Sequence, residues 1–194
     1  MENVIKFQIR KDESKTLWCG TRVYRIYAAK EFTTTTGKCV ERGSRGGWIE
    51  SEKNLSQDGG CWIADEACAY GNALVRDNAL VLDYASVFGN AIVRENAIVY
   101  DNAAVYGDSE VCGSALVFEY ARVCGKAKLL SGANVRGIAE VDGEKTLDVD
   151  VFSNEEPAFG VESGHDSNYI QDRVIFGGCG FKPVQSGNED DSKG

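Results

Sequence analysis

The sequence has very little proline, methionine and histidine. Its 194 residues include two prolines, one methionine and one histidine. A single histidine excludes any centre that needs several imidazole ligands, such as a three-histidine zinc site. No run of about 18 apolar residues occurs, and the first residues lack the basic-then-apolar pattern of a secretion signal. We therefore expect a cytoplasmic protein with no membrane partner.

The cysteines and the charge exclude further classes. Seven cysteines are present, an odd number with no pair at C-x-x-C spacing, which argues against a disulfide framework and against a four-cysteine zinc site. We expect reduced thiols, no metal and no cofactor. The net charge of -9 disfavours direct binding of nucleic acid.

From Ala67 onward the chain repeats a six-residue unit without a break. The first position is Ala, once Ser109, and the third is mostly Val, and thirteen consecutive rungs fit this register. A helix would need a period of 3.6, and a flat sheet would need reversing turns. Alternation within each rung points positions one and three inward. Positions five and six are rich in Gly, Asp, Glu and Asn, which tolerate the left-handed backbone of a bend.

A second period of eighteen residues indicates that three rungs close one triangular coil. Position five is Gly at every third rung, and another series carries acidic residues: Gly71, Gly89, Gly107, Gly125 and Gly143 form the first, and Asp83, Asp101 and Glu119 the second. Neighbouring coils would then pair as parallel strands around a narrow Ala and Val interior. The sequence predicts an all-β fold, a left-handed parallel β-helix of about five coils over residues 55–150.

The repeat AxV(Y/F/R)(G/D)N resembles the hexapeptide-repeat proteins. The segment Gly46-Gly-Trp-Ile-Glu-Ser-Glu-Lys-Asn-Leu-Ser-Gln-Asp-Gly59 is similar to a subfamily frequent in bacteria and their phages, and the resemblance covers roughly residues 12–150. It implies the β-helix fold and assembly into trimers. In the family at large it also implies acyl transfer, with a histidine on a coil as general base at a groove between subunits.

The flanking regions are expected to close the two ends of the β-helix. Residues 1–54 contain alternating stretches and are predicted to form a small β cap, because an uncapped first coil would expose strand edges. Residues 151–185 are predicted to be a C-terminal capping segment, with a strand and turn at 174–181. Residues 186–194 are expected to be a disordered tail.

The candidates for catalysis are weak. The predicted coils contain no histidine, so a transferase would depend on His165 beside Asp166, in the segment after the β-helix. Cys112 and Cys124 stand at position four, where equivalent rungs carry Arg94 and Tyr106, and we interpret them as plain substitutions. The main interpretation is that the protein has no catalytic residues.

The outward positions form three different faces. One is aromatic, the next begins with two arginines, and these residues are the candidate binding set: Tyr70, Phe88, Tyr106, Arg76 and Arg94. The third face is apolar and is the candidate interface between copies of the chain: Leu80, Leu82, Ile98, Tyr100, Leu116 and Phe118. This much exposed apolar surface predicts a homotrimer first and a dimer second, unless a terminal module covers it.

The functional hypothesis is therefore a non-catalytic binding protein. It would be phage-encoded and would act in the host cytoplasm, where it blocks or sequesters a host protein such as a CRISPR-type or other defence complex. Two alternatives stay open. One is a hexapeptide-type acyltransferase, or a nucleotidyl-type transferase, with a site at a subunit groove that uses His165 and Asp166. The other is a sponge for a nucleotide signal, clamped by Arg76, Arg94 and the tyrosines.

Overall fold

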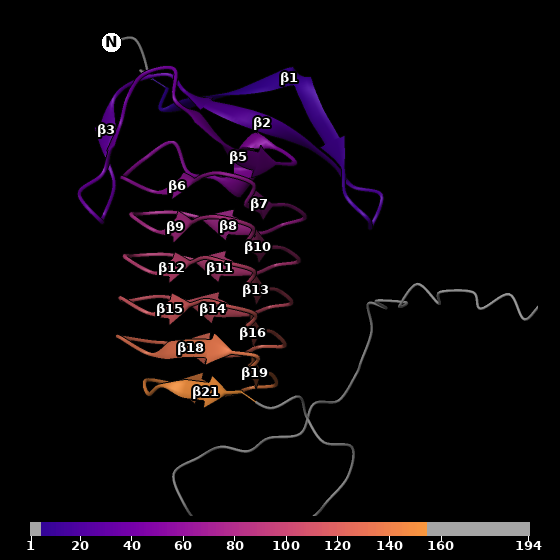
Figure 1. The fold of residues 1–194 in the computed structure, drawn as a ribbon, viewed down its shortest axis with the longest axis vertical. Helices are drawn as coiled ribbons and strands as arrows, with labels where there is room; N and C mark the ends of the chain where they lie inside the picture. Colours follow the sequence, from indigo (N-terminus) through magenta and orange to yellow (C-terminus); the bar gives the residue numbers. More distant parts are fainter. Residues whose placement is uncertain (1–4, 155–194) are drawn as a thin grey trace, which may run out of the picture.

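Three sheets, built mainly from short parallel strands, wrap around a common axis in the computed structural model, which describes residues 5–154 (Figure 1). Sheet 1 comprises β1 (Phe7–Thr16), β2 (Arg22–Ala28), β5 (Arg45–Ile49), β7 (Cys68–Ala69), β10 (Ser86–Val87), β13 (Ala104–Val105), β16 (Arg122–Val123) and β19 (Glu140–Val141). Sheet 2 comprises β8 (Leu74–Val75), β11 (Ile92–Val93), β14 (Glu110–Val111), β17 (Lys128–Leu129) and β20 (Thr146–Leu147). Sheet 3 comprises β6 (Trp62–Ile63), β9 (Leu80–Val81), β12 (Ile98–Val99), β15 (Leu116–Val117), β18 (Asn134–Gly137) and β21 (Val151–Ser153).

The register confirms a parallel β-helix, with eighteen residues per coil from β6 to β20. The step is twenty residues between β5 and β7 and sixteen between β18 and β21. Ser86 pairs in parallel with Cys68 on one side and with Ala104 on the other. Each coil contributes one strand to sheet 1 and one to sheet 3, and every coil after the first contributes one to sheet 2; the six strands of sheet 3 correspond to six coils. The first coil begins earlier in the chain than the repeat suggested, because β5 pairs in parallel with β7 and Leu55 bridges to Val75.

The interior is made of the first and third positions of each rung, as predicted. Representative residues such as Ala97 and Val99 are 0% exposed, and the same holds for their equivalents in neighbouring coils. Small Ala alternates with branched Val because the triangular cross-section leaves room for only one medium side chain per strand. The core is therefore a continuous column from the cap to the last coil.

The bends adopt the left-handed backbone that their composition predicted. Asp83, Asp101 and Glu119 have φ values of 58°, 57° and 61°, and Gly89 has 72°. The acidic side chains also have a structural use: Asp101 Oδ2 accepts a hydrogen bond of 3.1 Å from the Glu119 N–H, and Glu119 Oε2 accepts one of 2.6 Å from the Gly137 N–H. These carboxylates join one coil to the next.

Two hairpins stand at the N-terminal end. β1 and β2 are antiparallel, and β2 is antiparallel to β5, so sheet 1 continues past the first coil and its upper edge is paired. β3 (Phe32–Thr33) and β4 (Cys39–Val40) form the second hairpin. This hairpin descends beside sheet 3 (Figure 1). There the Phe32 ring packs edge-on against Trp62, with the ring centroids 5.3 Å apart, and Thr35 Oγ1 donates a hydrogen bond of 3.1 Å to Asn96 Oδ1.

The first coil is interrupted by a single 3-10 turn, η1 (Glu52–Asn54), and a side chain repairs the interruption. Asn54 is fully buried, and its Nδ2 donates to the carbonyls of Gly71 at 3.1 Å and Ala73 at 2.9 Å. In the regular coils these two carbonyl positions receive backbone N–H groups from the preceding coil. The Asn54 amide thus replaces two missing backbone donors, which explains why an asparagine stands at this position.

At the other end, β21 pairs with β18 and belongs to the sixth coil. The remainder of the predicted C-terminal capping segment, including 174–181, and the predicted tail 186–194 lie outside the described residues. Within residues 5–154 no helix is long and apolar enough to cross a membrane.

Candidate binding face

The outward side of sheet 1, here called the aromatic face, carries two columns of side chains. Position two gives Trp48 at the top and then the small residues Cys68, Ser86 and Ala104. Position four gives the predicted aromatic column of Tyr70, Phe88 and Tyr106. Because neighbouring coils repeat the same backbone, each column is straight, and the small residues leave one side of the aromatic rings uncovered.

The aromatic column is a stacked ladder. The Tyr70 and Phe88 ring centroids are 5.0 Å apart with an interplanar angle of 6°, and those of Phe88 and Tyr106 are 4.9 Å apart at 2°. Stacked pairs of this kind contribute about 0.5–1.5 kcal/mol each beyond their buried area. The ladder therefore supports the coils, and it also presents a rigid apolar surface.

The upper part of the ladder is covered by the cap. Tyr70 is 8% exposed and packs in a cluster with Val23 and Trp48, against which Leu17 and Phe88 also pack. Lower down, Phe88 and Tyr106 are half-buried. Of the three aromatic residues predicted to bind, Phe88 and Tyr106 are therefore accessible, whereas Tyr70 packs against the β1–β2 hairpin.

Within residues 5–154, three large aromatic side chains that were not among the candidates are the most exposed ones. Trp18, Tyr84 and Tyr120 are 68%, 68% and 64% exposed. Trp18 lies in the turn between β1 and β2, and the two tyrosines lie in bends that lead from sheet 3 into sheet 1. The sequence held a signal for the tyrosines, since position six of a bend is mostly Asn and these two depart from it at the same corner.

Below the ladder the aromatic face becomes polar. Arg122 and Glu140 form a long ion pair of 3.9 Å, and Cys124 Sγ lies 3.5 Å from Glu140 Oε1. Burial raises the pKa of the Cys124 thiol to about 12, and burial together with a hydrogen bond to Cys124 raises the pKa of the Tyr106 phenol. Neither group is a nucleophile at neutral pH, because both hold their protons.

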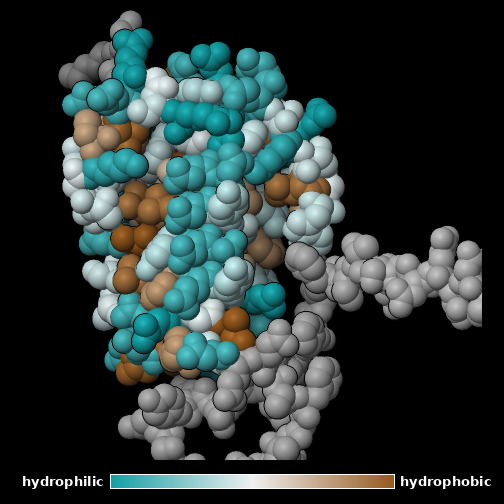
Figure 2. Space-filling view, in the orientation of Figure 1, coloured by the Kyte–Doolittle hydropathy of each residue, from teal (hydrophilic) through white to brown (hydrophobic). Residues whose placement is uncertain are grey.

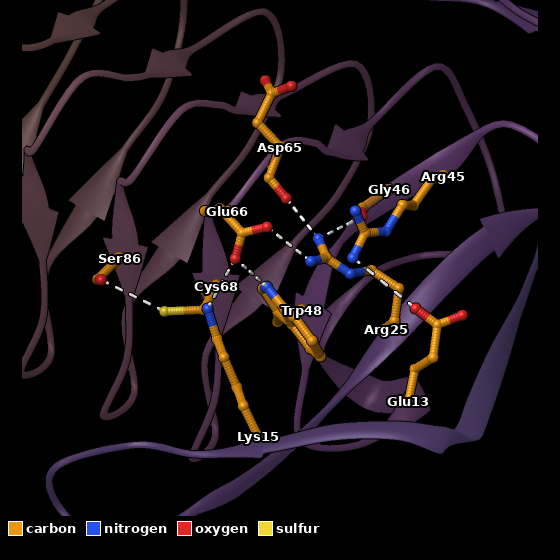
Figure 3. A network of polar contacts seen from close by, with 10 residues as sticks. All are labelled: Glu13, Lys15, Arg25, Arg45, Gly46, Trp48, Asp65, Glu66, Cys68 and Ser86. Atoms are coloured by element: carbon orange, nitrogen blue, oxygen red, sulfur yellow. Dashed lines mark hydrogen bonds and ion pairs between the residues drawn. The ribbon is translucent and has the colours of Figure 1, made fainter.

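A polar network fixes the cap above the aromatic face (Figure 3). Glu66 accepts hydrogen bonds from Arg25 at 2.6 Å, Trp48 Nε1 at 2.8 Å and Lys15 at 3.2 Å. Partial burial would raise the pKa of Glu66, but these three donors outweigh it and hold the pKa at about 2. Arg25 is 1% exposed, and its guanidinium stacks 3.7 Å from the Trp48 ring. Its remaining donor, Nε, lacks a hydrogen-bond acceptor among residues 5–154.

The two candidate arginines lie on sheet 2, around the corner from the ladder. Arg94 is engaged by carboxylates: its Nε donates to Glu110 Oε1 at 2.6 Å, and its Nη1 forms an ion pair with Glu95. Arg76 is more exposed and lies 3.8 Å from Asp77 Oδ2. The fold therefore separates the arginines from the aromatic residues and gives Arg94 an intramolecular partner.

The outward side of sheet 3, here called the apolar face, carries the candidate self-association residues. The β3–β4 hairpin lies beside its upper end, where Leu80 is 2% exposed. The five others are half-buried, and Tyr100 stacks on Phe118 at 4.9 Å: Leu82, Ile98, Tyr100, Leu116 and Phe118. Figure 2 shows hydrophobic residues as a band on the left of the view, over β9, β12 and β15.

The candidate catalytic residues His165 and Asp166 lie outside the described residues. Within 5–154, no group of three or more His, Cys, Asp or Glu side chains is arranged to hold a metal ion. Of the cysteines there, Cys61, Cys68, Cys112 and Cys124 are buried, and Cys19 and Cys39 are exposed, all as free thiols.

Comparisons with known proteins give one partial similarity. No protein-family model matches the chain. A stretch of 43 residues is 44% identical to the uncharacterized acetyltransferase YdcK of Escherichia coli (strain K12). The stretch covers 22% of this chain and 13% of that protein, so the similarity extends over a small part of either sequence.

Proposed function

We propose that this chain is a non-catalytic binding protein that recognises a partner protein through the lower part of its aromatic face. The observation that carries the proposal is the exposure of Trp18, Tyr84 and Tyr120 around a ladder of stacked rings. Large aromatic residues are enriched at recognition hot spots. Here they stand on stacked coils or on a paired hairpin, so little backbone ordering opposes binding.

The arrangement suits a partner with a flat or convex apolar surface. Phe88 and Tyr106 offer ring surface beside the small side chains of Ser86 and Ala104, which form a shallow floor. The polar Arg122 and Glu140 pair below would set the orientation of the partner. The biological setting we propose is a phage-infected bacterium, with a host defence complex as the partner; this rests on the resemblance of segment 46–59.

The test is capture of partners by the tagged full-length protein from bacterial lysate, followed by quantitative binding with the captured protein. Tyr84→Ala combined with Tyr120→Ala should weaken binding at least tenfold, and Ala104→Arg should block it by filling the floor. Val149→Ala, an exposed apolar residue remote from the face, is the matched control. Unchanged affinity in both aromatic-face variants, with normal thermal unfolding, would refute the proposed site.

We also propose that the uncovered part of the apolar face contacts a second copy of the chain, with a trimer expected before a dimer. The support is the half-buried ladder from Ile98 to Phe118, which the β3–β4 hairpin does not extend far enough to bury. Ile98→Glu and Leu116→Glu should shift the sedimentation coefficient to that of a monomer. A wild-type chain that sediments as a monomer at high concentration would rule this out.

Acetyl transfer is the second candidate function, and the similarity to YdcK is the observation that favours it. The described part of the chain contains no histidine, so a general base would have to come from His165 with Asp166. Release of free coenzyme A from acetyl-CoA in the presence of acceptor amines tests this. Activity that His165→Ala abolishes would replace the binding proposal. The ion pairs of Arg94 with Glu110 and Glu95 disfavour the nucleotide sponge, for which this guanidinium would have to be free.

A further inference from the structure

A lysine amine and a cysteine thiol are buried against each other where the cap meets the first coil. Lys6 Nζ lies 3.1 Å from Cys61 Sγ, and both residues are 0% exposed. Lys6 precedes β1, and Cys61 is the inward small residue of the rung that contains β6. The two residues are 55 positions apart in the chain, so only folding brings them together.

The surroundings of the amine are unusual for a lysine. Its hydrogen-bond acceptors are the carbonyl oxygens of Asp58 at 3.0 Å, Gly59 at 3.4 Å and Cys61 at 3.0 Å, together with Sγ. All four are formally neutral, so no carboxylate in this group balances an ammonium charge. Burial accordingly lowers the pKa of Lys6, which increases the fraction of neutral, nucleophilic amine.

We propose that Lys6 and Cys61 are a site of oxidative cross-linking, at which one oxygen atom becomes inserted between Nζ and Sγ to give a covalent N–O–S bridge. The separation of 3.1 Å carries this inference. A single bridging oxygen spans nearly that distance, whereas a direct S–N bond would require the two atoms to approach much further through a packed core.

The chemistry balances with dioxygen as the oxidant. The neutral amine, the thiol and one O₂ give the N–O–S bridge and one water. One N–H bond, the S–H bond and the O–O bond break; one N–O bond and one S–O bond form, and the second oxygen leaves as water with the two released protons. Nitrogen and sulfur each lose two electrons, and O₂ takes up all four. Two equivalents of a dithiol return the four electrons and regenerate the amine, the thiol and a second water.

The structure also accounts for the access of oxygen to the Lys6–Cys61 pair and for the selection of Cys61 over the other buried thiols. Asp58 and Gly59, whose carbonyls touch Nζ, are exposed, so a single turn of backbone separates the pair from dissolved oxygen. The other buried thiols have different neighbours. Cys68 Sγ lies 3.3 Å from Ser86 Oγ, and Cys112 Sγ lies 3.3 Å from the Leu129 carbonyl. Among residues 5–154, no lysine amine forms a hydrogen bond with either sulfur, although Lys15 acts electrostatically on Cys68.

The bridge would fasten the cap to the β-helix. It would close a loop between residues 6 and 61 that contains both hairpins and the first strand of the first coil. A cross-link over a loop of this length restricts the unfolded chain and raises the unfolding temperature by several degrees. The oxidised protein should therefore unfold at a higher temperature than the reduced protein.

The test is intact and peptide mass spectrometry of the full chain, purified under argon with dithiothreitol or equilibrated with air. Air should add about 14 mass units, one oxygen gained and two hydrogens lost, in a peptide that joins residues 6 and 61 and is released by dithiothreitol. Cys61→Ser and Lys6→Arg should each remove this species, and Cys68→Ser should retain it.

Three outcomes would overturn the proposal. A chain that keeps its reduced mass after prolonged exposure to air contains no such bridge. A gain of one whole oxygen that survives in Lys6→Arg is simple thiol oxidation. A loss of about two mass units in the joined peptide is a direct S–N link. The first measurement uses the wild-type chain, so it does not depend on whether the variants fold.

Discussion

The indole Nε1 of Trp48 donates a hydrogen bond of 2.8 Å to Oε2 of Glu66. Trp48 belongs to β5 in the first coil, and Glu66 lies in the bend that leads to β7 in the second. The same carboxylate also receives Arg25 and Lys15 from the β1–β2 hairpin. One side chain thus joins the cap and the first two coils.

Replacing Glu66 with Gln should destabilise the protein by about 1–3 kcal/mol, because the buried Arg25 guanidinium loses its anionic partner. The range allows for solvent, since the Glu66 side chain is 40% exposed. Urea denaturation followed by tryptophan fluorescence measures the change. The control is Glu144→Gln, which breaks an exposed pair with Lys126 and should change stability by less than about 0.5 kcal/mol. Equal losses of stability in the two variants would show that the hydrogen bonds to Glu66 add no more stability than an exposed ion pair.

Stability should fall in acid through the same residue. The pKa of Glu66 is lowered from 4.5 to about 2 in the folded protein. A lowered carboxylate pKa stabilises the fold at pH values above the unfolded pKa, and this stabilisation disappears as pH falls from about 4.5 toward 2. After screening, the loss should be about 1–2 kcal/mol. Unfolding free energies at pH 7, 4.5 and 3 test this, and Glu66→Gln should show a smaller decrease than wild type over the same interval.

Asp101 should tolerate Asn and resist Ala. Its backbone is left-handed, and Oδ2 accepts the N–H of Glu119 in the next coil. Asn keeps an acceptor oxygen and adopts left-handed φ at low cost, so Asp101→Asn should lie within about 0.5 kcal/mol of wild type. Asp101→Ala loses the acceptor and strains the bend, at a cost of about 2–3 kcal/mol. Chemical denaturation of the two variants measures their unfolding free energies. Similar free energies for both would show that the hydrogen bond from the Glu119 N–H to Asp101 adds nothing to stability.

Asn54 should tolerate substitution poorly. Asn54→Ala removes the donors to the Gly71 and Ala73 carbonyls and the acceptor for the Ser51 N–H, for an expected loss of about 2–4 kcal/mol. Asn54→Asp should be at least as damaging, because an anionic oxygen would face two carbonyl oxygens. The exposed bend residue Asn102 provides the matched control as Asn102→Ala. Hydrogen exchange of the amides around η1 would locate the damage, and protection equal to wild type would contradict the proposed role.

The regular part of the fold could be predicted because its contacts join residues eighteen apart. Burial of Ala97 and Val99, the left-handed bend at Asp101 and the stacking position of Phe88 all follow from the spacing of residue types. Arg94 could have been placed with equal ease, since Glu110 stands on the same sheet one coil further on. Arg94 was assigned to binding from its residue type alone, without asking which side chains of the next coil would lie beside it.

Other contacts could not be predicted because they do not follow the period. The inclusion of β5 in the first coil, the route of the β3–β4 hairpin and the pairing of Lys6 with Cys61 join segments of unrelated sequence. Nothing in the composition of these segments specifies which coil they contact. Their positions depend on tertiary packing, which a single sequence does not encode in its local pattern.

The step of eighteen residues in the regular coils also limits how the gene for this protein can change in length. Stacked partners such as Asn72 and Asn90 keep their alignment only if an insertion or deletion in the coils spans one whole coil. Duplication of such a unit would lengthen the aromatic and apolar columns together by about 4.8 Å and leave each on its own side. Duplication of one six-residue rung would instead turn every later side chain onto the next face, so that rings from the apolar column would continue the line begun by Tyr70 and Phe88.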